Sequence, residues 1–374
     1  MSLFPPRFTA SKNFKHELPS RTAVLLIQLG TPSAPETGAV RKYLAQFLAD
    51  RRVVEIPRFI WMLILHGIIL NVRPKKSAEK YKAVWMPDGS PLQVYTARQA
   101  SLLKAYLGQA GQALEVAYAM RYGEPSVASV MRKLREHNVE RLLVVPMYPQ
   151  YSGATTASSL DAVFAELQTW RNMPELRTVK HFHRHEAYLN ALAKRIQSQW
   201  QRDRAPDKLV ISFHGMPKRT LLEGDPYHCE CLVTGRLLAE KLGLRENEYE
   251  VTFQSRFGKA EWLQPYTDKT LEALGKQKVE RVEVVCPGFV ADCLETLEEI
   301  AIEGKESFIR AGGQDFHYSA CLNDSPEWIA ALAQIVLEHM GGWTVLRLGA
   351  EAALGAREDQ QLRKKRATGL GARA

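Results

Sequence analysis

Cysteine is scarce in this chain of 374 residues, and its five cysteines are an odd number. A disulfide framework pairs its cysteines and is typical of short secreted domains, so we expect reduced thiols here. The first 22 residues also lack the apolar core of a secretory signal peptide. These absences together predict a cytoplasmic protein.

Loops that bind nucleotide phosphates are missing as well. Gly30-Thr-Pro32 follows the first apolar run, yet neither of the glycine-rich phosphate motifs occurs anywhere in the chain. We therefore expect no nucleotide cofactor. The apolar stretch 59–70 is twelve residues long and is too short to cross a bilayer, which needs about 20 residues.

Positive charge is in excess, with a formal net charge of +9. This balance favours an acidic partner such as nucleic acid, an anionic membrane surface or a small polycarboxylate. Much of the excess lies in a Gly- and Ala-rich tail over 346–374, where we expect little fixed structure. Because no nucleic-acid recognition motif accompanies the charge, we do not expect binding to nucleic acid.

Apolar runs typical of buried strands recur along the chain and alternate with stretches of helical spacing, such as 125–137 and 267–276. Alternation of this kind predicts an α/β protein with parallel sheets flanked by helices. The segment ending Val139-Glu-Arg-Leu-Leu-Val-Val-Pro146 is echoed by the one ending Val279-Glu-Arg-Val-Glu-Val-Val-Cys-Pro287, which suggests two similar halves. We expect strands at 23–29, 114–119, 141–147, 178–182, 208–213, 250–254, 281–285 and 315–319.

Two domains are expected from this length and pattern. The first comprises 20–178 together with 325–345, the second comprises 179–324, and 346–374 is the tail. We expect the active site in the cleft between them.

His214 ends the apolar run Leu209-Val-Ile-Ser-Phe-His214 and is followed by Gly215. Ligands of open α/β sheets bind at the carboxyl ends of strands, so a histidine here is placed for chemistry. The alternative is a histidine that only hydrogen-bonds at a strand end. A neutral imidazole can accept a proton near neutral pH.

An acidic stripe follows the strand at 281–285. Glu295, Glu299 and Glu303 are spaced four residues apart in an expected helix over 291–303, with Asp292 one turn earlier. A stripe of like charge disfavours a helix, which suggests a purpose such as guiding cations or protons. A solvated acidic face is the alternative. With His214 these carboxylates form an incomplete ligand set that can hold a divalent ion loosely.

Three other features have both a functional and a structural interpretation. The apolar stretch 59–70, with Arg73, Lys75 and Lys76 close behind, is either a buried helix or an exposed lip for a flat apolar ligand or a membrane surface. Cys229-Glu-Cys231 can hold a soft metal but lacks further cysteines to complete a cluster. The imidazoles of 181–185 have a metal-like spacing, although a structural role is more common.

The motifs together resemble the ferrochelatase family of class II chelatases. His214-Gly-Met-Pro217 with Glu223-Gly-Asp-Pro-Tyr227 is similar to the family signature, and 287–299 looks like its second site. The likeness covers roughly 23–343. It implies two Rossmann-like domains and an enzyme of heme biosynthesis that inserts ferrous iron, its metal substrate, into protoporphyrin IX.

By this resemblance His214 and Glu295 are the catalytic and metal-binding pair, and Asp292, Glu299 and Glu303 are an acidic path. Residues that match the porphyrin pocket are Leu29, Arg73, Tyr81, Arg121 and Trp262. The segment 59–76 matches the porphyrin lip, and its apolar part can touch a membrane surface.

Two departures accompany the likeness. Gln28 stands where an asparagine is common in the family, and C-terminal cysteines are absent, so no iron-sulfur cluster is expected.

We expect a monomer. A chelatase for coproporphyrin or another metal, or a non-enzymatic carrier of tetrapyrrole or metal, is the alternative function.

Overall fold

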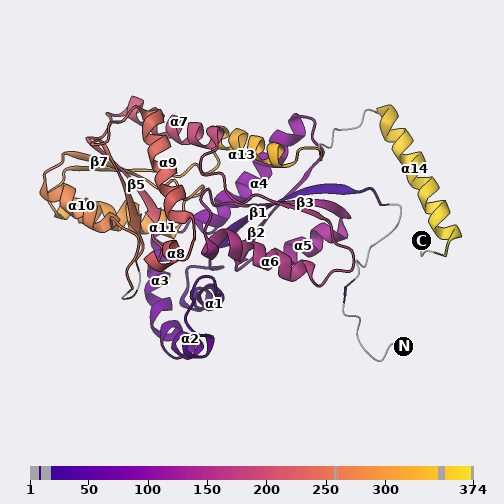
Figure 1. Cartoon of the computed structure of the whole chain (residues 1–374), viewed down its shortest axis with the longest axis horizontal. Coiled ribbons are helices and arrows are strands. Elements are labelled where there is room, and N and C mark those ends of the chain that lie inside the picture. Colours follow the sequence, from indigo (N-terminus) through magenta and orange to yellow (C-terminus); the bar gives the residue numbers. More distant parts are fainter. Residues whose placement is uncertain (1–7, 10–17, 257, 259, 344–349, 372–374) are drawn as a thin grey trace.

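Two parallel sheets, each covered by helices, form the body of the protein (Figure 1). The structure is a computed structural model that describes residues 8–9, 18–256, 258, 260–343 and 350–371. Each sheet has four strands. The expected α/β class is therefore confirmed.

The first sheet has the strand order β2-β1-β3-β4. Its strands are β1 (Arg21–Gly30), β2 (Glu115–Tyr122), β3 (Val139–Pro146) and β4 (Glu175–Thr178). The β1 side chains from 22 to 28 are all buried, as expected for a central parallel strand with helices on both faces. Helices of this half include α4 (Pro91–Gln109), α5 (Val127–Glu136), η2 (Gly153–Ala157) and α6 (Ser158–Leu167).

The second sheet has the strand order β6-β5-β7-β8, which repeats the order of the first. Its strands are β5 (Lys208–His214), β6 (Tyr249–Gln254), β7 (Arg281–Val285) and β8 (Asp315–Ser319). Because β3 and β7 occupy the same place in the two sheets, the echo noted in the sequence corresponds to equivalent strands. Helices of this half are α7 (Glu186–Arg202), α8 (Lys218–Leu222), α9 (Tyr227–Leu242), α10 (Thr267–Lys276) and α12 (Lys305–Arg310).

One continuous apolar core joins the two halves. It contains Val24 and Leu26 of β1 together with Leu209 and Ile211 of β5. Helix α13 (Pro326–His339) returns after β8 and packs on α4 and β3 of the first half and on α7 of the second. The expected assignment of 325–345 to the first domain stays a prediction.

The segment before α4 projects from the body (Figure 1). It contains α1 (Thr37–Leu48), α2 (Arg58–Ile64), η1 (Leu65–Ile69) and α3 (Leu70–Val84). In the tail, residues 350–369 form helix α14 (Ala350–Gly369), while 346–349 and 372–374 lie outside the described residues.

Two expected elements differ from the structure. The strand expected at 178–182 is β4 at 175–178. The helix expected over 291–303 begins only at Leu294, as the short α11 (Leu294–Thr296), and continues as the π-helix η3 (Leu297–Gly304). Cys293 and Thr296 form a reciprocal capping box, which fixes the start of this helix. Asp292 precedes the helix, because it is hydrogen-bonded to Asn323 in the loop at 321–323.

Candidate active site

His214 lies at the carboxyl end of β5, in register with Gln254 of β6. Its Nδ1 is 2.7 Å from the Gly215 carbonyl oxygen, so Nδ1–H donates there and Nε2 is left as the acceptor of a neutral ring. The Tyr227 hydroxyl donates to the His214 carbonyl oxygen at 2.9 Å. These contacts hold the imidazole in one orientation, with a basic nitrogen available.

Gly215 lets the chain pass close to β6 at this point. A Cβ there would lie 2.6 Å from the Gln254 carbonyl oxygen and 3.3 Å from Cε3 of Trp262. The half-buried Trp262 therefore lies directly beside Gly215, the residue after His214. A larger residue would displace the strand end that carries the imidazole.

Gln254 links this strand end to the acidic segment. Its side-chain amide donates to the Glu295 carbonyl oxygen at 2.8 Å and to the Glu299 carboxylate at 3.3 Å. The Ser255 backbone N–H donates to Glu299 at 2.7 Å, and its hydroxyl donates to the same carboxylate. His214, Glu295 and Glu299 thus all lie close to Gln254 and Ser255, at the end of β6.

Burial raises the pKa of Glu299, although hydrogen bonds from Ser255 and the nearby His214 oppose this rise. The charge of Glu295 raises it further. A carboxyl of this kind can exchange a proton closer to neutral pH than an exposed glutamate can.

The π-helix changes the stripe that the sequence predicts. The Lys80 ammonium on α3 donates to Glu298 and to Glu303, at 2.8 Å in each case. These two glutamates are five residues apart, which is the spacing of the backbone hydrogen bonds in a π-helix. Glu303 therefore pairs with Glu298 through a cation from the first half.

Asp292 is buried in a closed network. Its carboxylate accepts hydrogen bonds from the Tyr318 hydroxyl at 2.6 Å and the Asn323 amide at 2.6 Å. The Cys321 backbone N–H and the Thr296 hydroxyl donate to it at 3.2 and 3.3 Å. These contacts hold Asp292 at the start of α11. Its place in an acidic path stays a prediction.

A small cavity brings Glu295 together with two of the predicted pocket residues, Leu29 and Tyr81. Its lining also includes Gly30, Thr31, Tyr43, Val84, Ser90, Pro91, Leu92, Cys293 and Leu294. Burial and the charge of Glu295 raise the pKa of Tyr81, so its phenol stays neutral. The enclosed volume is about 10 Å³, room for about one water molecule, so a larger ligand must lie across its mouth or displace the wall.

The Arg121 side chain is hydrogen-bonded to residues of the first half. Its guanidinium donates to Asp50 at 2.6 Å and to Ser158 at 2.8 Å, and it lies 4.7 Å from the ring centre of Tyr122. Arg73 is half-buried on α3. Direct contact of either residue with an acidic ligand stays a prediction.

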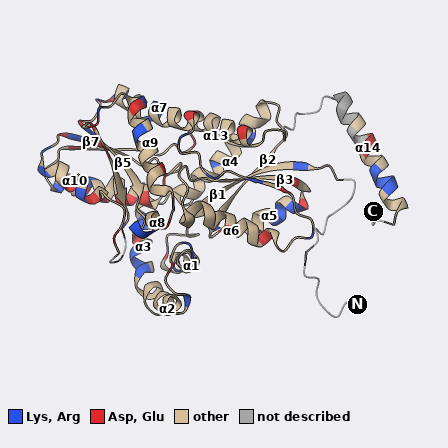
Figure 2. Ribbon diagram, viewed as in Figure 1, with Lys and Arg blue, Asp and Glu red and all other residues tan. Residues whose placement is uncertain are grey.

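The lip has one buried and one exposed face, so both interpretations of 59–70 hold in part. Trp61 and Leu65 are buried, and the Trp61 indole donates to the Leu48 carbonyl oxygen at 2.6 Å. On the other face Phe59 and Leu63 are 79% and 62% exposed. Figure 2 shows Lys and Arg along α3, the helix that follows this segment. No described helix is long and apolar enough to span a membrane.

Known proteins with a similar sequence are ferrochelatases. A profile of the ferrochelatase family matches residues 21–340. The ferrochelatase of Chromobacterium violaceum is 56% identical over 370 residues, which is 99% of each chain. That of Herminiimonas arsenicoxydans is 59% identical over 339 residues, covering 91% of this chain and 92% of the relative.

The chain belongs to the ferrochelatase family. This confirms the resemblance given by the sequence motifs and the expectation of an enzyme of the metal-inserting class. A solved structure, SirB from Bacillus subtilis with Fe³⁺, agrees in fold, with a TM-score of 0.52 over 85% of this chain and 95% of that one. At 12% identity this likeness supports the chelatase-type fold alone.

Gln28 is the departure from the ferrochelatase pattern near the first strand end. It is buried, and its side-chain oxygen accepts a hydrogen bond from the Leu29 backbone N–H at 3.3 Å. The longer amide thus folds back onto its own backbone. Leu29, which lines the cavity, is the residue that this contact positions.

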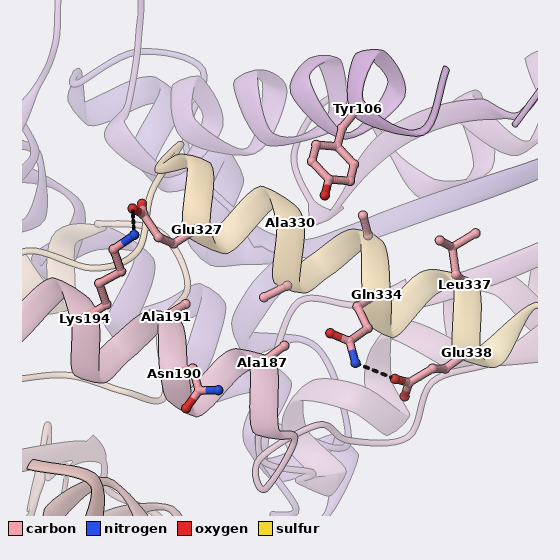
Figure 3. A pocket seen from close by; sticks show the side chains of 12 residues that line it. Tyr106, Ala187, Asn190, Ala191, Lys194, Glu327, Ala330, Gln334, Leu337 and Glu338 are labelled. Carbon is pink, nitrogen blue, oxygen red and sulfur yellow. Dashed lines mark hydrogen bonds and ion pairs between the residues drawn. The ribbon is translucent and has the colours of Figure 1, made fainter. Parts of the chain in front are cut away.

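Other candidate features lie apart from this ferrochelatase site. Cys231 is buried and Cys229 is exposed, so the two thiols face different sides of α9. A surface groove of about 500 Å³ between α7 and α13 is lined largely by alanine and by the pairs Lys194–Glu327 and Gln334–Glu338 (Figure 3). Neither feature supplies a base beside a metal-binding carboxylate.

Proposed function

We propose that the enzyme inserts ferrous iron into protoporphyrin IX to form protoheme, the last step of heme biosynthesis. The reaction removes two pyrrole protons from a flat ring and strips water from the ion. It therefore requires a base, a weak binding place for the metal and a pocket that distorts the ring. His214, Glu295 and the apolar residues that line the cavity are the candidates for these three parts.

His214 and Glu295 are the proposed catalytic pair. The imidazole Nε2 and the Glu295 carboxylate would share the iron before insertion; as the iron passes into the ring, Nε2 accepts one pyrrole proton and the Glu295 carboxylate accepts the other. The observation that carries this proposal is the Gln254 amide, which ties the Glu295 backbone to the strand position paired with His214. An incomplete ligand set holds the ion loosely enough to release it into the ring.

Asp292, Glu299 and Glu303 are the proposed acidic path. Of these, Glu299 is best placed to relay a proton, because it lies beside Glu295 and burial raises its pKa. Glu303 lies farther along η3 and is 52% exposed, so it forms the outer end. Asp292 supports the path by fixing the start of α11.

The porphyrin is proposed to enter across the lip. Leu29 and Tyr81 contact one face of the ring above Glu295, and Trp262 contacts it beside His214. Arg73 and Arg121 are proposed to attract the propionates. Binding energy from the apolar lip can then be used to bend the ring.

We further propose that ferrous iron is a substrate, that neither an iron-sulfur cluster nor a nucleotide takes part, and that the protein works as a cytoplasmic monomer. The exposed face of the lip, flanked by cations, suits contact with an anionic membrane surface. Such contact would let an apolar porphyrin pass directly into the pocket.

The test is an anaerobic assay of the purified chain with ferrous iron and protoporphyrin. An enzyme accelerates the appearance of the heme absorbance over the rate without protein. A carrier binds porphyrin and iron but leaves this rate unchanged, and that result would overturn the proposal. Coproporphyrin in parallel tests the alternative substrate, which is favoured if it turns over faster.

A further inference from the structure

Two histidines and one glutamate converge away from the residues assigned to iron insertion. His181 and His183 lie in the segment between β4 and α7, and Glu230 lies in the first turn of α9. Nδ1 of His181 is 2.7 Å from one Glu230 carboxylate oxygen, and Nδ1 of His183 is 3.3 Å from the other. A candidate ligand atom from each residue lies within 4.8 Å of the other two.

This spacing suits a transition-metal ion. Zinc binds imidazole nitrogen and carboxylate oxygen at about 2.0 to 2.2 Å, so neighbouring ligands of a tetrahedral ion lie about 3.4 Å apart. The two imidazole rings meet nearly edge to face, with centres 4.9 Å apart and planes at 72°. Small side-chain rotations would bring the three ligand atoms onto one ion.

Nδ1 of His183 lies 3.3 Å from Glu230, but the contact does not have the geometry of a hydrogen bond. His183 and Glu230 are each 6% exposed, and Nδ1 of His183 makes no hydrogen bond. A buried polar atom that makes no hydrogen bond destabilises a protein. Pairing of His181 with Glu230 accounts for one imidazole, but it does not explain why a second is buried beside the same carboxylate.

The surrounding backbone holds the three residues in place. The Tyr151 N–H donates to Glu230 at 2.7 Å, and the Thr234 hydroxyl donates to the His183 carbonyl oxygen at 3.0 Å. The His181 side chain is 40% exposed, which leaves a path from solvent.

We propose that His181, His183 and Glu230 bind a divalent transition ion of the zinc class at a site separate from the insertion site. Two imidazoles and one carboxylate leave a fourth position for water at the exposed His181 side. Nitrogen ligands favour such an ion over magnesium or calcium, which prefer oxygen. Because the site joins α9 to the segment after β4, a bound ion would fix that segment onto α9.

The test measures zinc binding to the full chain carrying His214→Ala, which removes the proposed insertion ligand. Equilibrium dialysis with metal analysis gives the stoichiometry and Kd, and cobalt absorption reports the ligand geometry. We expect one zinc per chain. Adding His181→Ala or Glu230→Gln should weaken binding more than about 100-fold, beyond the 10- to 100-fold effect of an outer partner.

His185→Ala is the matched control, because this neighbouring imidazole pairs with Glu338 instead, at 2.9 Å. It should leave the zinc affinity unchanged, as should Cys229→Ser. Far-ultraviolet circular dichroism verifies that each variant is folded, and the exposed His181 makes its variant the least disruptive. The proposal is overturned if the His214→Ala protein binds no zinc, or if His185→Ala weakens binding as much as His181→Ala.

Discussion

Nε2 of His214 can accept a proton, because Nδ1–H donates to the Gly215 carbonyl oxygen. We expect His214→Ala to lower iron insertion by at least about 100-fold, the lower end of the range for a positioned base. Porphyrin binding should persist, since the apolar lip is untouched. Turnover and the porphyrin fluorescence titration are measured on the same preparation. Turnover close to that of the wild type would remove His214 from the mechanism.

Glu295 is the carboxylate proposed to share the metal. Glu295→Gln keeps the shape of the side chain but removes its charge, so we expect insertion to slow by about 100-fold. The control is Glu306→Gln, which alters a 63% exposed carboxylate beside Arg310 on α12. Equal rates for the two variants would show that charge at Glu295 does not matter.

Asp50 is the anion that holds Arg121 in place. Burial opposes its ionisation, but hydrogen bonds from Ser158, the Arg52 N–H and Tyr122 outweigh this, and with Arg121 they lower its pKa. Its contribution to stability is therefore present above the ordinary pKa of about 3.9 and is lost as the pH falls through the lower folded value. We expect Asp50→Asn to lower the free energy of unfolding by about 1.5 to 3 kcal/mol at pH 7.

Urea unfolding of wild type and variant between pH 7 and pH 3.5 checks this prediction. The difference between them should shrink toward the acidic end. Asp161→Asn is the control, because its pair with Arg52 is 46% exposed on the aspartate side and contributes little. A difference in the free energy of unfolding that grows as the pH falls would contradict this prediction.

At the scale of elements, local sequence predicts most strands but not the acidic helix. Runs such as 209–213 and 281–285 are buried in parallel sheets, where apolar β-branched residues are needed on both faces. In the π-helix, Glu298 and Glu303 are bridged by Lys80, which comes from α3. A contact between residues more than 200 positions apart leaves no periodic signal in the segment itself.

The same limit applies to the candidate site. A histidine at a strand end and glutamates after another strand can be recognised, because topology alone brings such ends together. Gln254 and Ser255 could not be found in this way, since a polar pair after an apolar strand is common. Their role appears only when Glu299 is seen to accept the Ser255 N–H.

The lip is an element whose exposed face should bind membranes. We expect the double variant Phe59→Ser and Leu63→Ser to weaken binding to vesicles containing anionic lipid by at least about tenfold, because each large apolar side chain contributes about 1.5 to 3 kcal/mol when fully buried. Stability should hold, since both side chains are exposed. Co-sedimentation measures the binding.

Met173→Ser is the control for this variant, because Met173 is a 56% exposed apolar residue in the first half away from the lip. It should bind vesicles like the wild type. If it weakens binding equally, or if the wild type does not bind, the lip is not a membrane contact.

At the scale of the whole molecule, the proposed insertion site is shared between the halves. The second half supplies His214, Glu295 and Glu299, while the first supplies Leu29, Tyr81 and Lys80. The core that runs through both halves fixes their separation. On this proposal the metal ligands come from the second half, while the ring is contacted by Leu29 and Tyr81 of the first half and by Trp262 of the second.

An incomplete ligand set cannot select iron by affinity, because nitrogen and oxygen ligands bind zinc more tightly than ferrous ion. We therefore expect the enzyme to insert zinc into protoporphyrin as well, at a rate within about tenfold of that for iron. The fluorescence of zinc protoporphyrin measures this without exclusion of oxygen. His214→Ala should abolish zinc and iron insertion together, because both ions use the same base. Iron turnover without any zinc turnover would show that the site is closed around one metal, contrary to the loose arrangement argued from Glu295 and His214.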